Sequence, residues 1–336
     1  MNLLRYISFP LVPFYYLATW LRNKLYDLGI KSSTTYDVPI ICIGNLNVGG
    51  TGKTPMIEYL IRLLQNNYKI ATLSRGYKRK TKGFVIADET INAQIIGDEP
   101  FQFYNKFNGI IVSVDADRRN GIRQLLSLVQ NPEVILLDDA FQHRKVKAGF
   151  NVLLTTYDNL YINDMVLPTG NLREPKSGAN RADVIIVTKC PISISENIKG
   201  QVVDHLKPLQ NQMVFFSSIK YSDKIKNSSE EITLQELKHK TFTLVTGIAD
   251  PNPLVDFLNN RGLIFEHLNF NDHHEFSEKE IMSLKSKELI LTTEKDFVRL
   301  EPYFKDSRQL FYLPIETVIS EAQIFDNLIT EFIVNF

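Results

Sequence analysis

The sequence predicts an α/β protein in which a mostly parallel sheet is flanked by helices, together with a smaller second α/β domain. Short apolar, β-branched runs alternate with segments of helical periodicity, which is the pattern of a parallel sheet covered on both faces. The first strand leads into a glycine-rich turn and a helix. The 336 residues are also long for one core, so two domains are expected.

Composition narrows the class of protein. The 38 basic and 38 acidic residues balance to a formal net charge of zero, which argues against nucleic acid as a partner. Cys42 and Cys190 are the only cysteines, and both lie in apolar runs, so a reducing compartment fits better than a secreted disulfide scaffold. The six histidines and two cysteines show no zinc-ligand spacing.

Residues 1–30 differ from the rest of the chain. They contain the uncharged stretch YISFPLVPFYYLATWL, which is broken by Pro10 and Pro13 and is too short to span a bilayer comfortably. The flanking charges leave a local positive excess that suits anionic headgroups: Arg5, Arg22, Lys24 and Lys31 against Asp27. We expect a peripheral, interfacial helix on the cytoplasmic face of the inner membrane. A terminal helix packed on the protein's own core is the alternative.

Residues 31–215 are expected to form the core, which begins with a strand, a phosphate-binding loop (P-loop) and a helix over residues 38–64. The glycines can adopt positive φ, so consecutive N–H groups can wrap a phosphate at the start of the helix. Lys53 would reach the β- and γ-phosphates of ATP, and Thr54 would offer its hydroxyl to Mg²⁺. The predicted nucleotide-binding residues are Asn47, Val48, Gly49, Gly50, Thr51, Gly52, Lys53 and Thr54, although the strict pattern has glycine where this chain has Asn47.

The next two segments carry charged residues at their ends. A strand at 70–73 runs into a basic loop that includes Arg75, at the sheet edge where α/β proteins bind ligands. Arg75 is therefore a candidate for substrate binding, and a solvated hairpin tip is the alternative. Gly97 opens a helix whose first turn holds Asp98 and Glu99, which could equally be simple caps. A strand at 110–114 then precedes a helix whose start carries Arg118 and Arg119.

An apolar strand at 134–137 delivers Asp138 and Asp139, which predicts the second half of a P-loop site, with one aspartate near Mg²⁺. Taken alone, the pair also fits a turn or helix cap. Strands at 151–154 and 184–187 follow, separated by a long connection that contains LPTGNLREP. Long connections of this kind are often functional, so Arg173 and Glu174 are candidates for substrate or phosphate contact.

Residues 216–240 are polar and are expected to form a linker or an exposed hairpin, and residues 241–336 a smaller α/β domain whose final helix could return to the core. This domain contains Asp272, His273 and His274. Neighbouring histidines in an extended segment point opposite ways, so one ring would face a cleft between the domains. A histidine beside an aspartate can act as a tuned base or orient one, and a loop histidine without a role is the alternative.

Seven motifs occur in a fixed order: GNLNVGGTGKTP, SRGY, GDEP, LLDDAFQHR, LPTGNLREP, DHHEF and LTTEKD. Together they resemble the tetraacyldisaccharide 4'-kinase family of the lipid A pathway, over roughly residues 1–300. The resemblance implies a membrane-associated N-terminal helix, a P-loop core and a smaller α/β domain. It also implies transfer of the ATP γ-phosphoryl group to the 4'-hydroxyl of a tetraacylated glucosamine disaccharide 1-phosphate.

The resemblance further implies roles for single residues. Asp98 would be the general base, supported by His273, with Glu99 near Mg²⁺. Asp138 and Asp139 would form a Walker-B-like pair facing Lys53 and Thr54. The residues that would line the site are Arg119, Gln142, His143, Arg173 and Glu174. Ala140 stands where the family usually has glycine, so we expect a less free backbone there.

Two other functions fit parts of the sequence. A P-loop GTPase or nucleotide-driven chaperone at the membrane is the closest rival, but residues 188–191 (TKCP) lack the aspartate of the usual guanine-reading signature. A membrane-bound scaffold with a decayed nucleotide site conflicts with the retained Lys53, Thr54, Asp98 and Asp138. No required protein partner is evident.

Overall fold

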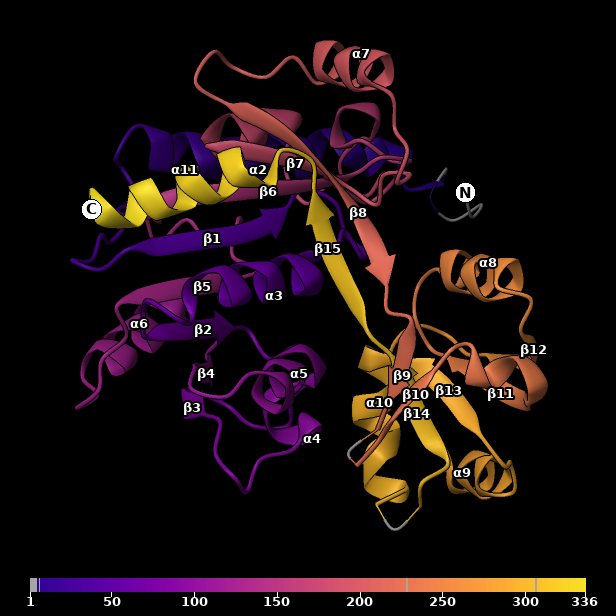
Figure 1. The fold of residues 1–336 in the computed structure, drawn as a ribbon. Coiled ribbons are helices and arrows are strands. Elements are labelled where there is room, and N and C mark those ends of the chain that lie inside the picture. Colours follow the sequence, from indigo (N-terminus) through magenta and orange to yellow (C-terminus); the bar gives the residue numbers. More distant parts are fainter. Residues whose placement is uncertain (1–4, 6, 228, 306) are drawn as a thin grey trace.

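The structure is a computed structural model that describes residues 5, 7–227, 229–305 and 307–336. It contains two sheets (Figure 1). The larger one has nine strands, namely β1 (Ile40–Asn45), β2 (Ile70–Ser74), β3 (Val85–Ile86), β4 (Ile111–Val114), β5 (Val134–Asp138), β6 (Phe150–Thr156), β7 (Val184–Thr188), β8 (Met213–Tyr221) and β15 (Ile315–Ile319). We call this sheet with its helices the large lobe.

The strand order of the large sheet is β15-β8-β7-β6-β1-β5-β2-β4-β3. Only the two edge pairs, β15 with β8 and β3 with β4, are antiparallel. The central strand β1 is buried along its whole length, and its side chains alternate between the two faces. Ile40 and Cys42 join one core, while Ile41 and Ile43 join the other. The predicted parallel sheet covered on both faces is therefore confirmed.

Different helices cover the two faces. One core includes side chains of α6 (Arg118–Leu126) and α7 (Glu196–Leu206). The other includes side chains of α3 (Lys53–Leu64), α4 (Ala93–Ile96), α5 (Asp98–Lys106) and α11 (Ala322–Val334). Helix α11 is the last element of the chain, and its Phe325, Ile329 and Ile333 are buried against the large sheet.

The second sheet and its helices form the small lobe. Its strands are β9 (Lys224–Lys226), β10 (Glu231–Thr233), β11 (Thr241–Thr246), β12 (Ile264–Asn269), β13 (Ile290–Thr293) and β14 (Leu310–Leu313), in the order β10-β9-β14-β13-β11-β12. Helix α8 (Asn252–Asn260) packs on one face, and α9 (Glu278–Lys285) and α10 (Glu294–Leu300) contribute to the core on the other. Strand β8 runs from the large sheet toward this lobe, and its antiparallel neighbour β15 runs back from the lobe to the large sheet (Figure 1).

The prediction of a linker over residues 216–240 is wrong for residues 216–221. These residues continue strand β8 to Tyr221, because Phe215 and Phe216 alternate into the two opposite cores of the large lobe. The expected hairpin exists as β9 and β10, but it forms the edge of the small sheet. Helices α7 and α10 and strand β15 were not expected from the sequence.

Helix α5 of the large lobe lies against helix α10 of the small lobe, and Figure 1 shows the two helices side by side where the lobes meet, which we call the seam. Two further pieces, the P-loop and the turn after β5, lie at the same edge of the large sheet because β1 and β5 are parallel neighbours with Ile43 opposite Asp138. The fold thus places every element that carries the predicted site near one edge of one sheet or at this seam.

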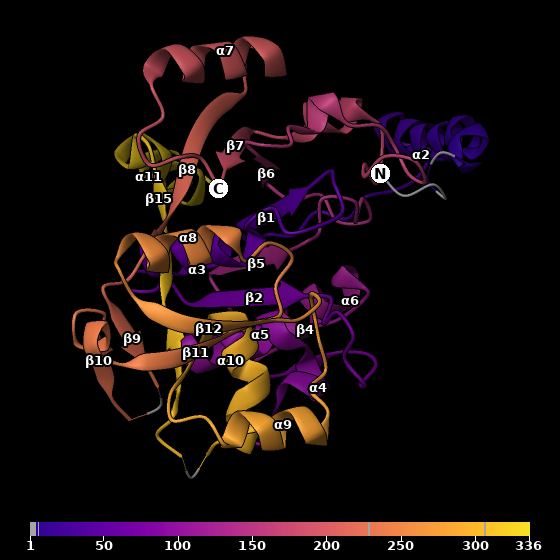
Figure 2. The ribbon, with the colours of Figure 1, turned by 90° about the vertical axis from the view of Figure 1, so that its right-hand side faces the viewer.

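Helix α2 (Val12–Asp27) lies at the periphery of the large lobe (Figure 2). Asn23 is its only buried residue. The helix is held through polar contacts: Tyr15 Oη donates to Arg173 O at 2.9 Å, and Arg22 Nη2 donates to Gln142 O at 2.8 Å. Within the described residues, no helix is both long enough and apolar enough to cross a membrane.

Candidate active site

The P-loop is held from two sides in a conformation that leaves Gly49 and Gly50 exposed and Gly52 half-buried. Gly49 and Gly52 have φ values of 113° and 83°, and helix α3 begins at the next residue, Lys53. Thr188 Oγ1, at the end of β7, donates to Thr51 O at 2.9 Å, and Asn47 Nδ2 donates to Asp164 Oδ2 at 3.1 Å. Asn47 therefore anchors the loop at the position where the strict motif has glycine.

The Lys53 ammonium faces the carboxylate of Asp139, with 3.7 Å between Nζ and Oδ1. Arg173 donates to both oxygens of the same carboxylate, from Nη2 at 2.7 Å and from Nη1 at 3.1 Å. Burial alone would raise the pKa of Asp139, but Lys53 and Arg173 outweigh it and lower the pKa to about 2. Asp139 also has a φ of 46°, whereas Ala140, which replaces the family's usual glycine, does not have a positive φ.

Asp138 has a different electrostatic environment. It is 9% exposed and accepts a hydrogen bond from Ser74 Oγ at 3.1 Å. Burial and the charge of Asp139 raise its pKa to about 6, against the opposing influence of Lys53. The two adjacent carboxylates thus differ in proton affinity: Asp139 holds its negative charge readily, and Asp138 does not. A cation bound near Asp138 would therefore stabilise its charge the most.

The sequence singled out Arg119, but its neighbour Arg118 is the one beneath the site. Arg118 is 2% exposed, and it donates to Asp115 O at 2.6 Å and to Asp138 O at 2.9 Å. Arg119 is half-buried and pairs with Asp117 at 3.6 Å. His143 lies on the same side, 3.9 Å from Asp117, and burial together with Arg118 lowers its pKa to about 4, so this ring is neutral at pH 7.

Glu174 and Gln142 lie inside the wall between helix α2 and the P-loop. Glu174 is 2% exposed and accepts hydrogen bonds from Asn23, from Arg181 Nη2 at 2.7 Å and from Gln142 Nε2 at 3.0 Å. Gln142 Nε2 also donates to Asn45 O at 2.8 Å. Both oxygens of Glu174 are therefore committed to protein groups, so its predicted contact with a substrate has no free acceptor in this arrangement.

Asp98 belongs to the large lobe, but residues of the small lobe contact its side chain. It follows Gly97 at the start of α5, and it accepts hydrogen bonds from Arg299 Nε at 2.9 Å and Nη2 at 2.6 Å. His273 Nδ1 lies 3.3 Å from the same oxygen. Burial would raise the pKa of Asp98, but the hydrogen bonds from His273 and Arg299 prevail and lower it to about 2. Glu99 lies 3.7 Å from Lys295 Nζ and adds to the negative potential at Asp138.

The two histidines face different surroundings. His274 Nε2 lies 3.1 Å from Glu280, and its ring stacks on Phe270 with 4.6 Å between ring centroids, so it packs within the small lobe. The ring of His273 turns to Asp98 instead. The segment is not extended as expected, because His273 has a φ of 59°. Tyr77, from the basic loop that carries the exposed Arg75, meets the His273 ring edge-on at 5.4 Å.

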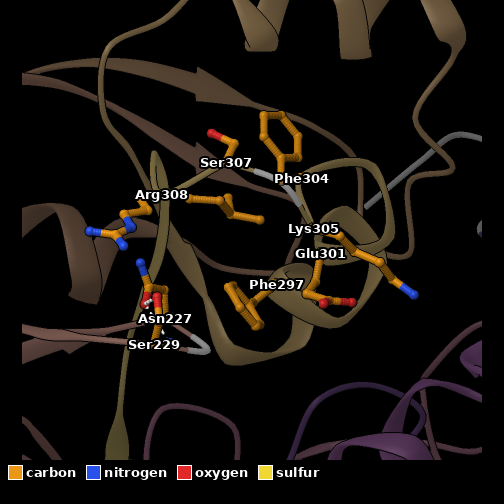
Figure 3. Close-up of a pocket in the computed structure, with 9 residues that line it drawn as sticks. Asn227, Ser229, Phe297, Glu301, Phe304, Lys305, Ser307 and Arg308 are labelled. Atoms are coloured by element: carbon orange, nitrogen blue, oxygen red, sulfur yellow. Dashed lines mark hydrogen bonds between the residues drawn. The ribbon is translucent and has the colours of Figure 1, made fainter.

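Two cavities lie away from the P-loop. The one in Figure 3 has a volume of about 200 Å³, and the side chains that line it, Phe297, Glu301 and Arg308 among them, belong to the small lobe. The second, of about 430 Å³, lies at the seam between α5 and α10 and is lined by Lys106, Glu294 and others. None of the predicted site residues lines either cavity.

The sequence matches known proteins along nearly its whole length. The model of the tetraacyldisaccharide-1-P 4'-kinase family matches residues 4–333. The chain belongs to this family. Its relatives include the tetraacyldisaccharide 4'-kinases of Flavobacterium johnsoniae, 54% identical over 99% of this chain and 98% of that protein, and of Phocaeicola vulgatus, 42% identical over 97% and 94%.

A solved structure supports the same assignment. The LpxK of Aquifex aeolicus, crystallised in complex with ATP, is 30% identical and superposes with a TM-score of 0.79 over 98% of this chain and 100% of that chain. Members of the tetraacyldisaccharide-1-P 4'-kinase family are phosphotransferases of lipid A biosynthesis, so the chain is a kinase. The GTPase, chaperone and decayed-scaffold alternatives are therefore set aside.

Proposed function

We propose that the protein transfers the γ-phosphoryl group of ATP to the 4'-hydroxyl of a tetraacyl-glucosamine disaccharide 1-phosphate, with Asp98 as the group that accepts the hydroxyl proton. The observation that carries the proposal is the pairing of two clusters: Lys53, Asp138 and Asp139 at the P-loop, and Asp98 with His273 at the seam. The first cluster suits a polyphosphate, and the second suits a proton transfer.

A sugar hydroxyl is a poor nucleophile, so the enzyme must align it with the γ-phosphorus and take its proton. Asp98 is suited to this task because every hydrogen bond that it accepts in the described part of the chain reaches Oδ2. Its Oδ1 is left for the substrate. The charge that develops on the transferring group would be stabilised by Lys53 and by the N–H groups of the P-loop. Arg173 would hold Asp139 in place beside them.

The donor set at the P-loop fits Mg²⁺. Thr54, Asp138 and Asp139 offer the hard oxygen ligands that this ion prefers, with Glu99 close enough to influence Asp138. Mg²⁺ in nucleotide sites is usually bound through one or two carboxylates together with phosphate oxygens and water, which this donor set allows. When bound, Mg²⁺ would neutralise phosphate charge. The positive charge of the ion would also lower the raised pKa of Asp138 and keep this carboxylate ionised.

The test of the base is Asp98→Asn in purified protein with γ-labelled ATP and the lipid disaccharide monophosphate. Loss of the acceptor should lower kcat by about 10²–10⁴-fold, while ATP binding, measured by calorimetry, stays intact. Asp88→Asn, an exposed carboxylate of the same lobe, is the control and should keep wild-type turnover. Near-normal turnover of Asp98→Asn would show that another group accepts the proton.

We also propose that helix α2 binds the cytoplasmic surface of the inner membrane. Its polar side faces the protein, through Tyr15, Arg22 and Asn23. Its apolar side is exposed in a stripe at helical spacing, with Phe14 at 73%, Leu17 at 58% and Leu21 at 49% exposure. Of the cations expected to meet headgroups, Arg5 and Arg22 are bound to protein oxygens, so Lys24 and Lys31 carry that role. A lipid substrate explains why an enzyme would keep such a face.

A further inference from the structure

Helix α10 presents two cations to the proposed catalytic pair, and the sequence motifs assigned neither of them. Lys295 and Arg299 are four residues apart and therefore lie on the same face of the helix. Lys295 Nζ lies 3.0 Å from His273 Nε2, and Arg299 donates twice to Asp98 Oδ2. Asp98 belongs to the large lobe and the other three residues to the small lobe, so the complete group forms only where the lobes meet.

Arg299 is itself held in a fixed orientation. Its Nη1 donates to Asp296 Oδ1 at 3.1 Å. Asp296 is fully buried and accepts hydrogen bonds at Oδ2 from Gly247 N at 2.8 Å and from Thr293 Oγ1 at 2.7 Å. The guanidinium fork is thus positioned before it meets Asp98, and only 10% of the Arg299 side chain is exposed. A loosely held surface ion pair would lack this support.

The hydrogen bonds around His273 favour one tautomer. A neutral imidazole accepts through only one ring nitrogen, and lysine has only donors. If Lys295 donates to Nε2, then Nδ1 carries the proton and donates toward Asp98 Oδ2. The opposite tautomer would direct Nε2–H at an ammonium. The 3.0 Å approach of Arg299 Nη2 to Nδ1 is then a close contact between two donors that share the Asp98 oxygen.

We propose that Arg299 and Lys295 are positioning residues for the phosphoryl transfer. Arg299 fixes Asp98 through Oδ2, so that Oδ1 points to the acceptor hydroxyl, and Lys295 fixes the tautomer in which His273 donates to Asp98. The inference rests on the proposed role of Asp98 as the proton acceptor. It adds that the small lobe takes part in catalysis by orienting a carboxylate that the large lobe carries.

The test compares Arg299→Gln and Arg299→Lys by steady-state kinetics. Loss of the fork should lower kcat by about 10–100-fold and leave the KM for ATP within about threefold, because ATP binds at the P-loop. Arg299→Lys should recover part of kcat, since it keeps the charge but not the fork. In an Asp98→Asn background, Arg299→Gln should not lower kcat further, because the carboxylate that Arg299 positions is gone.

The role of Lys295 is tested in the same way: Lys295→Met should lower kcat in the wild type and not in a His273→Ala background.

Glu294→Gln is the matched control. Glu294 is on the same helix and at the same seam, and it pairs with Lys106 of α5 at 2.5 Å without touching Asp98 or His273. Glu294→Gln alters a seam contact and leaves Asp98 and His273 untouched, so it should keep wild-type kcat. A loss of kcat equal to that of Arg299→Gln would mean that any change at the seam slows the enzyme, and the proposal falls. Full loss of activity in Asp98→Asn with wild-type kcat in Arg299→Gln overturns the positioning proposal alone. Near-normal activity in Asp98→Asn overturns the proposed base and this inference with it.

Discussion

Arg118 joins two strand ends beneath the proposed phosphate site. It is buried and donates to Asp115 O after β4 and to Asp138 O at the end of β5. Its own charge is paired electrostatically with Asp138 and Asp139, although burial lowers the pKa of Arg118 from its usual value. The position of Asp138 and Asp139, the two carboxylates of the proposed phosphate site, therefore depends on a residue that need not touch the nucleotide.

We expect Arg118→Met to lower the free energy of unfolding by about 2–4 kcal/mol, because two buried carbonyls and a carboxylate pair lose their partner. Arg119→Met should cost less than about 1 kcal/mol, since its ion pair with Asp117 is long, at 3.6 Å, and both side chains are partly exposed to solvent. Urea unfolding of both variants measures the difference. Equal costs would mean that the buried contacts of Arg118 contribute no more than a surface pair.

These residues also show what sequence reasoning could reach. The P-loop and the two aspartates were readable because their chemistry is local and each follows a strand. Arg118 and Arg119 are adjacent in the sequence, and only the phase of helix α6 decides which one is buried. Arg299 offered no signal, because its partner Asp98 is 201 residues away and the contact depends on how two lobes meet.

At the scale of elements, helix α2 docks on the large lobe through the polar groups of Tyr15, Arg22 and Asn23 and through Val12, while its larger apolar stripe faces away from the protein. Phe14→Asp combined with Leu17→Asp should reduce binding to vesicles that contain anionic lipids by about tenfold or more, because two apolar side chains lose their burial in the interface. The melting temperature should change little, as both side chains are exposed in the free protein. Cosedimentation and thermal unfolding make the two measurements.

The control for this prediction lies elsewhere on the surface. Ile192→Asp replaces another exposed apolar residue, at 82% exposure, and should leave vesicle binding unchanged. Equal binding by the wild type and the α2 variant would indicate that this stripe does not meet the membrane.

Strand β8 illustrates why element assignments failed where they did. MVFFSSIKY changes from apolar to polar along its length, because Phe215, Phe216 and Ser217 are buried in the large lobe whereas the residues that follow are half-buried or exposed. In the sequence alone, this change from apolar to polar residues indicates the start of a linker. Strand β15 and helix α11 return from the small lobe to the large sheet, and this topology is set by long-range pairing with β8 that leaves no local pattern.

At the scale of the whole molecule, the seam between the lobes contains buried charge. Lys106 lies between two carboxylates, Glu58 at 2.7 Å and Glu294 at 2.5 Å. Burial and the charge of Glu58 raise the pKa of Glu294 to about 7, against the opposing influence of Lys106. Glu294 Oε2 is buried without a hydrogen-bond partner in the described residues, which fits a carboxyl group that tends to keep its proton.

This carboxyl group should make stability depend on pH. Its pKa is about 7 in the folded protein and has an ordinary value near 4.5 in the unfolded chain, so the folded state binds more protons between these values. Below pH 4.5 the group is protonated in both states and has no effect. The destabilising contribution of Glu294 grows as the pH rises to 7 and is constant above pH 7.

The variant Glu294→Gln removes this contribution, so its melting temperature relative to wild type should rise between pH 5 and pH 7, by roughly 2 °C or more, and then level off. Glu288→Gln, an exposed carboxylate of the same lobe, should give a flat difference over that range. A flat difference for Glu294→Gln as well would mean that Lys106 keeps Glu294 ionised and that the seam closes on a full ion pair.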